Sequence, residues 1–160
     1  MKRSLLTRLL YVSSSLGMLL VSLILLNSLG CDYEMRLSSK EADYYAVCRA
    51  GKFTVIEREH GSKATWMVTA YQAVLGSQLI FFVTERSQVE APQTKSPLSD
   101  LNKMHGSFTM PLNYGWKKLT PDHIAIFQQS PHPEILQGHF EGSLDFYHRF
   151  WPSTPVKIAK

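Results

Sequence analysis

Histidines and carboxylates gather near the C-terminal end of this 160-residue chain, and these residue types could bind a metal ion. His132, His139 and His148 share a short window with Asp145. A metal site needs three or four such ligands that converge on one point. No H-E-x-x-H pair and no C-x-x-C pair is present to fix that convergence. We therefore keep these four residues as candidate metal ligands only, because isolated surface histidines are the simpler interpretation.

No motif in the sequence indicates a catalytic centre or a cofactor. Serines are plentiful, yet none lies in a G-x-S-x-G turn. The stretch Gly138–Gly142 has two glycines but lacks the glycine spacing of phosphate-binding loops. Neither cysteine lies in a recognisable catalytic signature. We predict no catalytic residue and no cofactor, and the sequence leans away from an enzyme.

Aromatic residues are concentrated in the segment 140–151, which reads FEGSLDFYHRFW. A strand would place four apolar side chains of this segment on one face: Phe140, Leu144, Phe146 and Phe150. Gly142 and Ser143 favour this strand over a helix, so we expect the segment to close the core. The alternative is an aromatic patch that binds a partner or faces a membrane. Its residues would be Phe140, Phe146, Phe150 and Trp151.

The N-terminal segment 1–30 has the composition of a membrane-targeting helix. Basic residues are followed by a charge-free stretch from Leu9 to Gly30, and a spanning helix needs ~20 mainly apolar residues. We prefer an uncleaved signal anchor. A secretory signal cut before Cys31 and a lipoprotein signal with Cys31 as the lipidated residue remain as alternatives. A buried core helix is the fourth and least favoured interpretation.

The charges around this segment predict which side of the membrane holds the rest of the chain. Lys2, Arg3 and Arg8 precede the apolar stretch, while Asp32 and Glu34 follow it. Positive flanking residues stay on the cytoplasmic side. We therefore expect a single-pass protein of the cell membrane, with the N-terminus cytoplasmic and the C-terminal domain outside. A secreted protein or a lipoprotein is the alternative location.

The charge balance excludes a general nucleic-acid-binding surface. Three of the 17 lysines and arginines belong to the targeting segment, so fourteen remain against 13 acidic residues. The resulting net charge of the exported part is +1, with both signs interspersed. Phosphate binding requires clustered positive charge. The expected partners are the lipid bilayer and a membrane or envelope protein, and no nucleic acid.

The two cysteines fit an exported domain without requiring a bond between them. Cys48 lies in the strand-like run YYAVCR, where a small buried thiol is common. We favour two separate thiols, or a lipid site plus a buried thiol, over a disulfide.

The exported part reads as a polar connector over 31–43 followed by a β-rich domain over 44–160. Two hairpins are predicted, 44–49 with 52–59 and 65–75 with 78–86. Their turns are Ala50-Gly51 and Gly76-Ser77, which supply the glycines that tight loops require. A helix over 64–75 is the rival to the second hairpin's first strand.

The second half of the exported part gives weaker signals. The proline-containing stretch near 88–103 predicts a long flexible loop. Short strands follow over 106–112 and 122–129, with a turn at 113–115. The fold class expected is mainly β, an N-terminal membrane-spanning or signal helix followed by a small antiparallel β domain, with α+β as the alternative.

The first 60 residues resemble small uncharacterised planctomycete-type bacterial proteins. The resemblance is carried by the basic start, the single hydrophobic segment and the hairpin Tyr44-Tyr45-Ala46-Val47 with Gly51. It implies the same extracytoplasmic address, and it carries over no known activity. We expect a membrane-anchored accessory or interaction protein. The alternative is a small exported metal-binding or hydrolytic domain that uses the C-terminal histidines and carboxylates.

Overall fold

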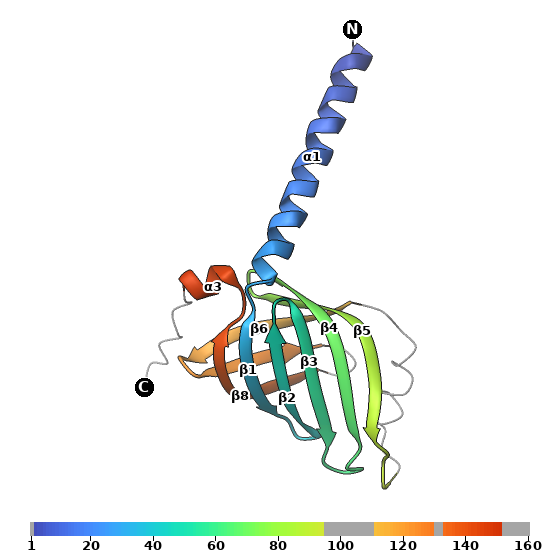
Figure 1. Ribbon diagram of the computed structural model, residues 1–160, viewed down its shortest axis with the longest axis vertical. Coiled ribbons are helices and arrows are strands. Elements are labelled where there is room, and N and C mark those ends of the chain that lie inside the picture. The colour runs from blue at the N-terminus through green and yellow to red at the C-terminus, as the bar shows by residue number, and fades with distance from the viewer. Residues whose placement is uncertain (1, 95–110, 130–132, 152–160) are drawn as a thin grey trace.

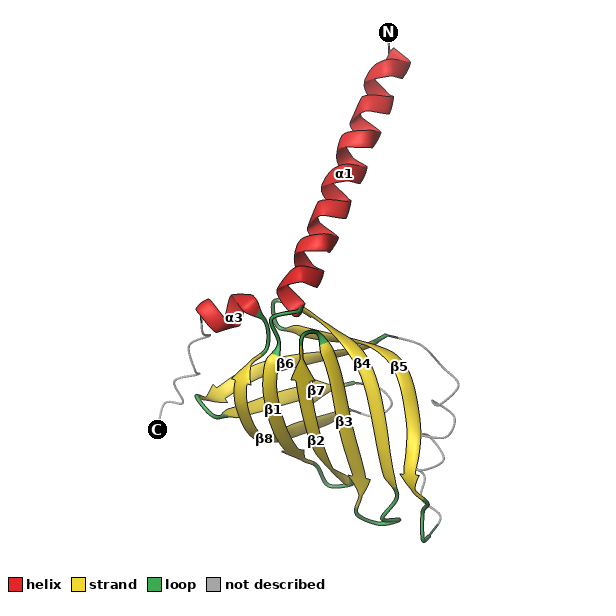
Figure 2. Cartoon of the chain, viewed as in Figure 1, coloured by secondary structure: helices red, strands yellow, loops and turns green. Residues whose placement is uncertain are grey.

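The computed structural model describes residues 2–94, 111–129 and 133–151. A long helix, α1 (Lys2–Ser28), projects from one end of a closed antiparallel barrel (Figure 1). A short helix, α3 (Phe146–Phe150), lies at the same end of the barrel as α1 (Figure 2). The fold-class prediction of an apolar N-terminal helix and a small antiparallel β domain is confirmed, as a mainly β structure.

Eight strands follow one another around the barrel, each paired with its sequence neighbour, and the last pairs with the first. They are β1 (Asp32–Ser38), β2 (Ala42–Arg49), β3 (Lys52–Glu59), β4 (Thr65–Leu75), β5 (Gln78–Glu90), β6 (Leu112–Thr120), β7 (His123–Gln128) and β8 (Glu134–Ser143). Each strand is thus paired on both sides, although β5 pairs with β6 only over Gln78–Phe81. Closure of this kind reduces the free strand edge that invites aggregation.

Both predicted hairpins form at the expected positions. Ala50 and Gly51 have φ of 49° and 81°, so both turn residues adopt the left-handed region that a two-residue loop of this hand requires. In the second hairpin Gly76 has a φ of 57°. The stretch 65–75 is strand β4, so the strand interpretation holds over the helical one.

The inside of the barrel is filled by side chains from alternate positions along the strands. On β1 these are Tyr33, Met35 and Leu37, while the residues between them face outward. Small residues such as Ala46 and Ala70 lie among large ones such as Trp116 and Phe140. An eight-stranded barrel is narrow enough for its side chains to fill it in this way.

The connector predicted over 31–43 is wrong, because most of it is strand β1, so the barrel domain begins near Asp32 rather than at 44. Tyr33, Met35 and Leu37 alternate with charged residues, which is the period of a half-buried strand. The sequence prediction missed this period because the outward-facing positions between the apolar residues are charged, which made the segment look like a polar connector. The strand gains its stability from β2 and β8, its partners on either side.

The predictions for the second half of the chain are partly wrong. The turn expected at 113–115 lies inside β6, where Gly115 pairs with Phe127 of β7. Strand β5 continues to Glu90, so the predicted loop near 88–103 starts later than expected. Its remainder from 95 and most of the strand expected over 106–112 lie outside the described residues. The strand predicted over 122–129 is β7.

Candidate functional site

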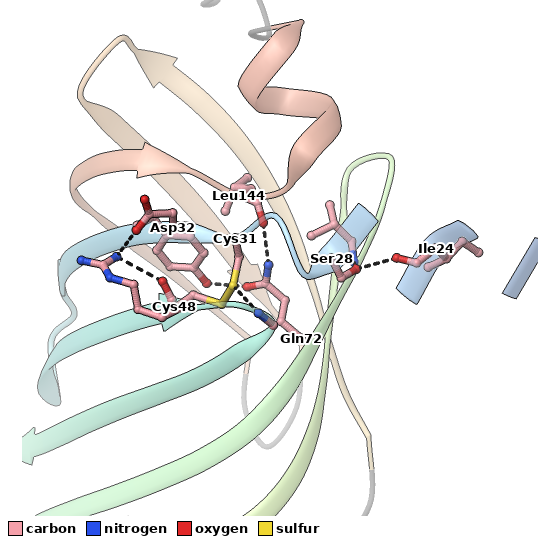
Figure 3. The surroundings of a disulfide bond; sticks show 11 residues. Ile24, Ser28, Cys31, Asp32, Cys48, Gln72 and Leu144 are labelled. Atoms are coloured by element: carbon pink, nitrogen blue, oxygen red, sulfur yellow. Dashed lines mark hydrogen bonds and ion pairs between the residues drawn. A yellow bond between two sulfur atoms is a disulfide. The ribbon is translucent and has the colours of Figure 1, made fainter. Parts of the chain in front are cut away.

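The end of α1 is joined to the barrel by the buried hydroxyl of Ser28. This side chain donates a hydrogen bond to the carbonyl of Ile24 at 2.8 Å within the helix (Figure 3), and it accepts one from the backbone N–H of Val74 at 3.1 Å. Ser28 is 1% exposed, so water does not replace either bond. The last turn of the helix is therefore part of the barrel's own hydrogen bonding.

Replacing Ser28 with alanine is expected to weaken the attachment of α1 to the barrel. The substitution leaves the Val74 N–H buried without its acceptor, which typically costs about 1–3 kcal/mol. Thermal unfolding of the purified full chain in detergent should show a lower midpoint. The matched control is Ser22→Ala, because Ser22 makes the same bond to a helix carbonyl, that of Met18, from an exposed position. Equal unfolding midpoints for Ser28→Ala and Ser22→Ala would contradict a stabilising hydrogen bond between Ser28 and Val74.

A disulfide between Cys31 and Cys48 ties the residue that precedes β1 to strand β2, with the two Cα atoms 5.7 Å apart (Figure 3). The expectation of two separate thiols is therefore wrong. Lipidation of Cys31 is also inconsistent with this structure, because its sulfur cannot carry both a thioether and a disulfide. The sequence missed the pairing because the bond depends on β1 lying beside β2, and the connector was not predicted to be a strand.

A buried glutamine links three parts of the barrel near this disulfide. Gln72 is 3% exposed; its amide donates to the backbone carbonyl of Leu144 at 2.9 Å and its carbonyl accepts from the hydroxyl of Tyr33 (Figure 3). Burial raises the pKa of Tyr33 well above its ordinary value. The phenol therefore stays neutral and acts as a hydrogen-bond donor that holds β1 against β4.

Asp145 and His148, two of the predicted metal ligands, lie together but are engaged in holding α3. Asp145 caps the helix and contacts both the backbone N–H and the Nδ1 of His148, at 2.6 and 2.7 Å. Its other oxygen accepts from Asn27 of α1 at 2.8 Å. Burial raises the pKa of Asp145, but the bonds from His148 and Asn27 outweigh it and the net direction is downward. The pair is a structural link between α1 and α3.

His139, the third predicted ligand, lies in a different cluster on the outer surface of the barrel. It faces His123 across strands β7 and β8, with ring centroids 5.9 Å apart. Asp122 contacts the Nδ1 of His123 at 3.1 Å. One ligand atom from each of these three residues lies within 4.8 Å of the others. The remaining candidate, His132, lies outside the described residues.

The carboxylate of this surface cluster is held in its charged form. Hydrogen bonds from Thr120 and then His123 lower the pKa of Asp122 to about 2. Two imidazoles and an ionised carboxylate are ligands that suit zinc, copper or nickel. Sequence reasoning missed Asp122 and His123 because they reach His139 only through strand pairing.

The barrel interior is polar at the end remote from α1. Glu57 and Glu59 are 7% and 2% exposed and occupy inward positions of β3. Burial raises the pKa of Tyr114 to about 12, and the charge of Glu57 adds to this rise. Burial and the same charge raise the pKa of Tyr44. The sequence did carry a signal, since Glu57 continues the alternating face of Phe53 and Val55.

The residues predicted as an aromatic interaction patch are divided by the structure. Phe140 is 4% exposed and belongs to the core, so it is excluded from any surface. Phe146 and Phe150 of α3 are 43% and 66% exposed, and Trp151, which follows the helix, is 65% exposed. The strand predicted over 140–151 ends at Ser143, and Asp145 then begins the helix. The expectation that Phe146 and Phe150 close the core is therefore wrong.

Comparison with known proteins gives no relative from which a function could be transferred. No protein-family model, no curated protein and no solved structure matches the chain. The helix α1 contains one stretch, Thr7–Ser28, that is long and apolar enough to cross a membrane, and a signal sequence would pass the same test. The function must therefore be inferred from the geometry of this chain alone.

Proposed function

We propose that the protein is a single-pass membrane protein that holds a small β-barrel against the outer surface of the cell membrane as an accessory or interaction module. The basic residues before α1 and the acidic residues at the start of β1 support a cytoplasmic N-terminus. The disulfide supports an oxidising compartment for the barrel. The targeting helix stays attached in this proposal.

The observation that carries this proposal is the bonding of the last turn of α1 to the barrel. Asn27 donates to Asp145 and accepts from the backbone N–H of Tyr147 at 2.8 Å, while Ser28 accepts from Val74. Cleavage before Cys31 would remove both residues and leave these buried or half-buried groups without partners. A signal that is discarded gains nothing from such bonds, so they favour an anchor that is kept.

A binding role fits the arrangement better than hydrolysis. A hydrolytic site needs a nucleophile, a base and an orienting group within hydrogen-bond reach of one another. Asp145 instead caps α3 by bonding to His148 within it, and His139 lies in the separate cluster with Asp122 and His123. Among the described residues the candidate ligands therefore lie in two separate places, with Asp145 and His148 at α3 and His139 on β8.

The test of the anchor is the mass and topology of the chain in cells. A reporter enzyme that is active only outside the cytoplasm, fused after Lys160, should be active. The chain recovered from washed membranes should have its full mass, less the two hydrogens lost to the disulfide. A mature chain that starts at Cys31 would overturn the proposal, as would activity confined to a cytoplasmic reporter.

The surface cluster of Asp122, His123 and His139 favours metal binding as a second candidate function. We expect Zn²⁺ added to the full chain in detergent to bind at a single site, measured by calorimetry. His139→Ala should weaken this binding about tenfold or more, since loss of a ligand costs at least as much as loss of its supporting hydrogen bond. His60→Ala is the matched control, because His60 contacts Asp43 at 3.0 Å outside any three-ligand group of the described residues. Equal binding by both variants would exclude this site.

A further inference from the structure

Helix α3 and the residue after it expose an unusual density of aromatic surface. Phe146, Tyr147, Phe150 and Trp151 are 43%, 57%, 66% and 65% exposed. Tyr147 stacks on Trp151, with centroids 5.7 Å apart, and Trp151 also touches Phe150 edge to face. Contiguous exposed apolar groups of this kind mark a surface that is covered in the working state.

The aromatic helix is fixed beside the last turn of α1. Asn27 bonds to both Asp145 and the backbone of Tyr147. Gly30 leaves the space that the ring of Phe146 occupies, because a Cβ there would lie 2.4 Å from that ring. Figure 2 shows α3 next to the foot of α1 and directed away from the long helix. Its position relative to any membrane is therefore set by α1.

The length of α1 places α3 at the membrane boundary. The apolar stretch Thr7–Ser28 has 22 residues, about 33 Å at the rise of an α-helix, which spans a hydrocarbon layer of ~30 Å. Asn27 belongs to the last turn, so α3 starts within about one helical turn of that layer's edge. The headgroup region is ~5–8 Å thick on each side. The aromatic helix falls inside it.

We propose that α3 lies in the headgroup layer of the outer leaflet that α1 crosses, with Phe146, Tyr147, Phe150 and Trp151 in contact with lipid. This inference rests on the proposed function, because it requires α1 to remain in the membrane. Tryptophan and tyrosine concentrate at this depth, where the ring is in apolar surroundings and its polar atom is hydrated. The occupant of the aromatic surface is thus a lipid bilayer.

The contacts between α3 and the barrel indicate what the proposed lipid contact would do. The ring of His148 packs edge to face on Trp116 of β6, with centroids 5.0 Å apart, while Arg149 contacts Asp32 of β1 at 3.3 Å. The helix is therefore attached to two strands of the barrel as well as to α1. Two membrane contacts, α1 and α3, would fix the orientation of the barrel relative to the bilayer, whereas one helix alone would let the barrel rotate. The end of the barrel that contains Glu57 and Glu59 would then face away from the bilayer.

The experiment is quenching of tryptophan fluorescence by brominated lipid. The full chain is placed in nanodiscs of phosphatidylcholine brominated close to the headgroup. Trp66 and Trp116 are 4% and 7% exposed inside the barrel and should contribute little. We expect clear quenching in the native chain and loss of most of it in Trp151→Phe. The control is Trp151→Phe/Val89→Trp, because Val89 is 58% exposed near the end of β5 that lies farthest from the Gly76–Ser77 turn, and its new indole should not be quenched.

The outcomes separate this inference from the function on which it rests. An unquenched Trp151 in a chain whose full mass is recovered from native membranes overturns the lipid contact and leaves the anchor intact. A mature chain cut before Cys31 overturns both. If Trp151 is unquenched in nanodiscs but protected from hydroxyl-radical oxidation in native membranes, a protein covers α3 and the lipid proposal fails.

Discussion

Replacing Gly138 with alanine should cost about 3 kcal/mol or more and leave the barrel partly open. Gly138 lies on β8 opposite Leu37 of β1, at the seam where the last strand meets the first. A Cβ at this position would lie 1.9 Å from the carbonyl oxygen of Arg36. The obstacle is backbone, which cannot rotate aside, so the two strands must separate. Overpacking of this kind costs ~1–3 kcal/mol and sometimes more.

The size of this effect decides whether the domain folds at all, because small domains have only ~5–15 kcal/mol of stability. Thermal unfolding in detergent, followed by tryptophan fluorescence, measures it. Gly115→Ala is the matched control, because a Cβ there would meet Phe127 at 3.5 Å, an ordinary contact distance. We expect the control to unfold close to the native temperature. A Gly138→Ala chain as stable as the control would show that the β1–β8 seam is not closed as described.

Removal of the disulfide should lower the free energy of unfolding by about 3 kcal/mol. Cys31 and Cys48 are separated by 17 positions, and a crosslink that closes a loop of this length stabilises by roughly that amount through the unfolded chain. The disulfide also connects the segment that follows α1 to strand β2. We expect Cys31→Ala/Cys48→Ala to fold with a lower midpoint and with the foot of α1 less firmly held.

Reducing agent provides the control for this prediction. Dithiothreitol should lower the melting temperature of the native chain towards that of the double variant, and it should leave the double variant unchanged. Alkylation of the unreduced, denatured chain should find no free thiol. A native chain that reacts at both cysteines without reduction would contradict the disulfide and restore the two separate thiols expected from the sequence.

The sequence by itself determined the elements whose signals are local. The charge-free stretch Leu9–Gly30 predicted a long apolar helix, and all but its last two residues lie in α1. Alternation and the glycines of the two tight turns located β2 to β5, because strand period and turn conformation depend on neighbouring residues. The same alternation ran through Tyr33, Met35 and Leu37, and the charges between them concealed it.

The tertiary structure decided everything that depends on which strands become neighbours. Pairing of β1 with β8 joins positions that lie roughly a hundred residues apart in the sequence, and its register is set by packing inside the barrel and by the room that Gly138 provides. The pairing of β1 with β2 brings Cys31 to Cys48, that of β1 with β8 brings Asn27 to Asp145, and that of β7 with β8 brings His139 to His123. Such contacts leave no local pattern in the sequence, because the partners lie far apart along the chain. They meet only when the strands pair and the core packs.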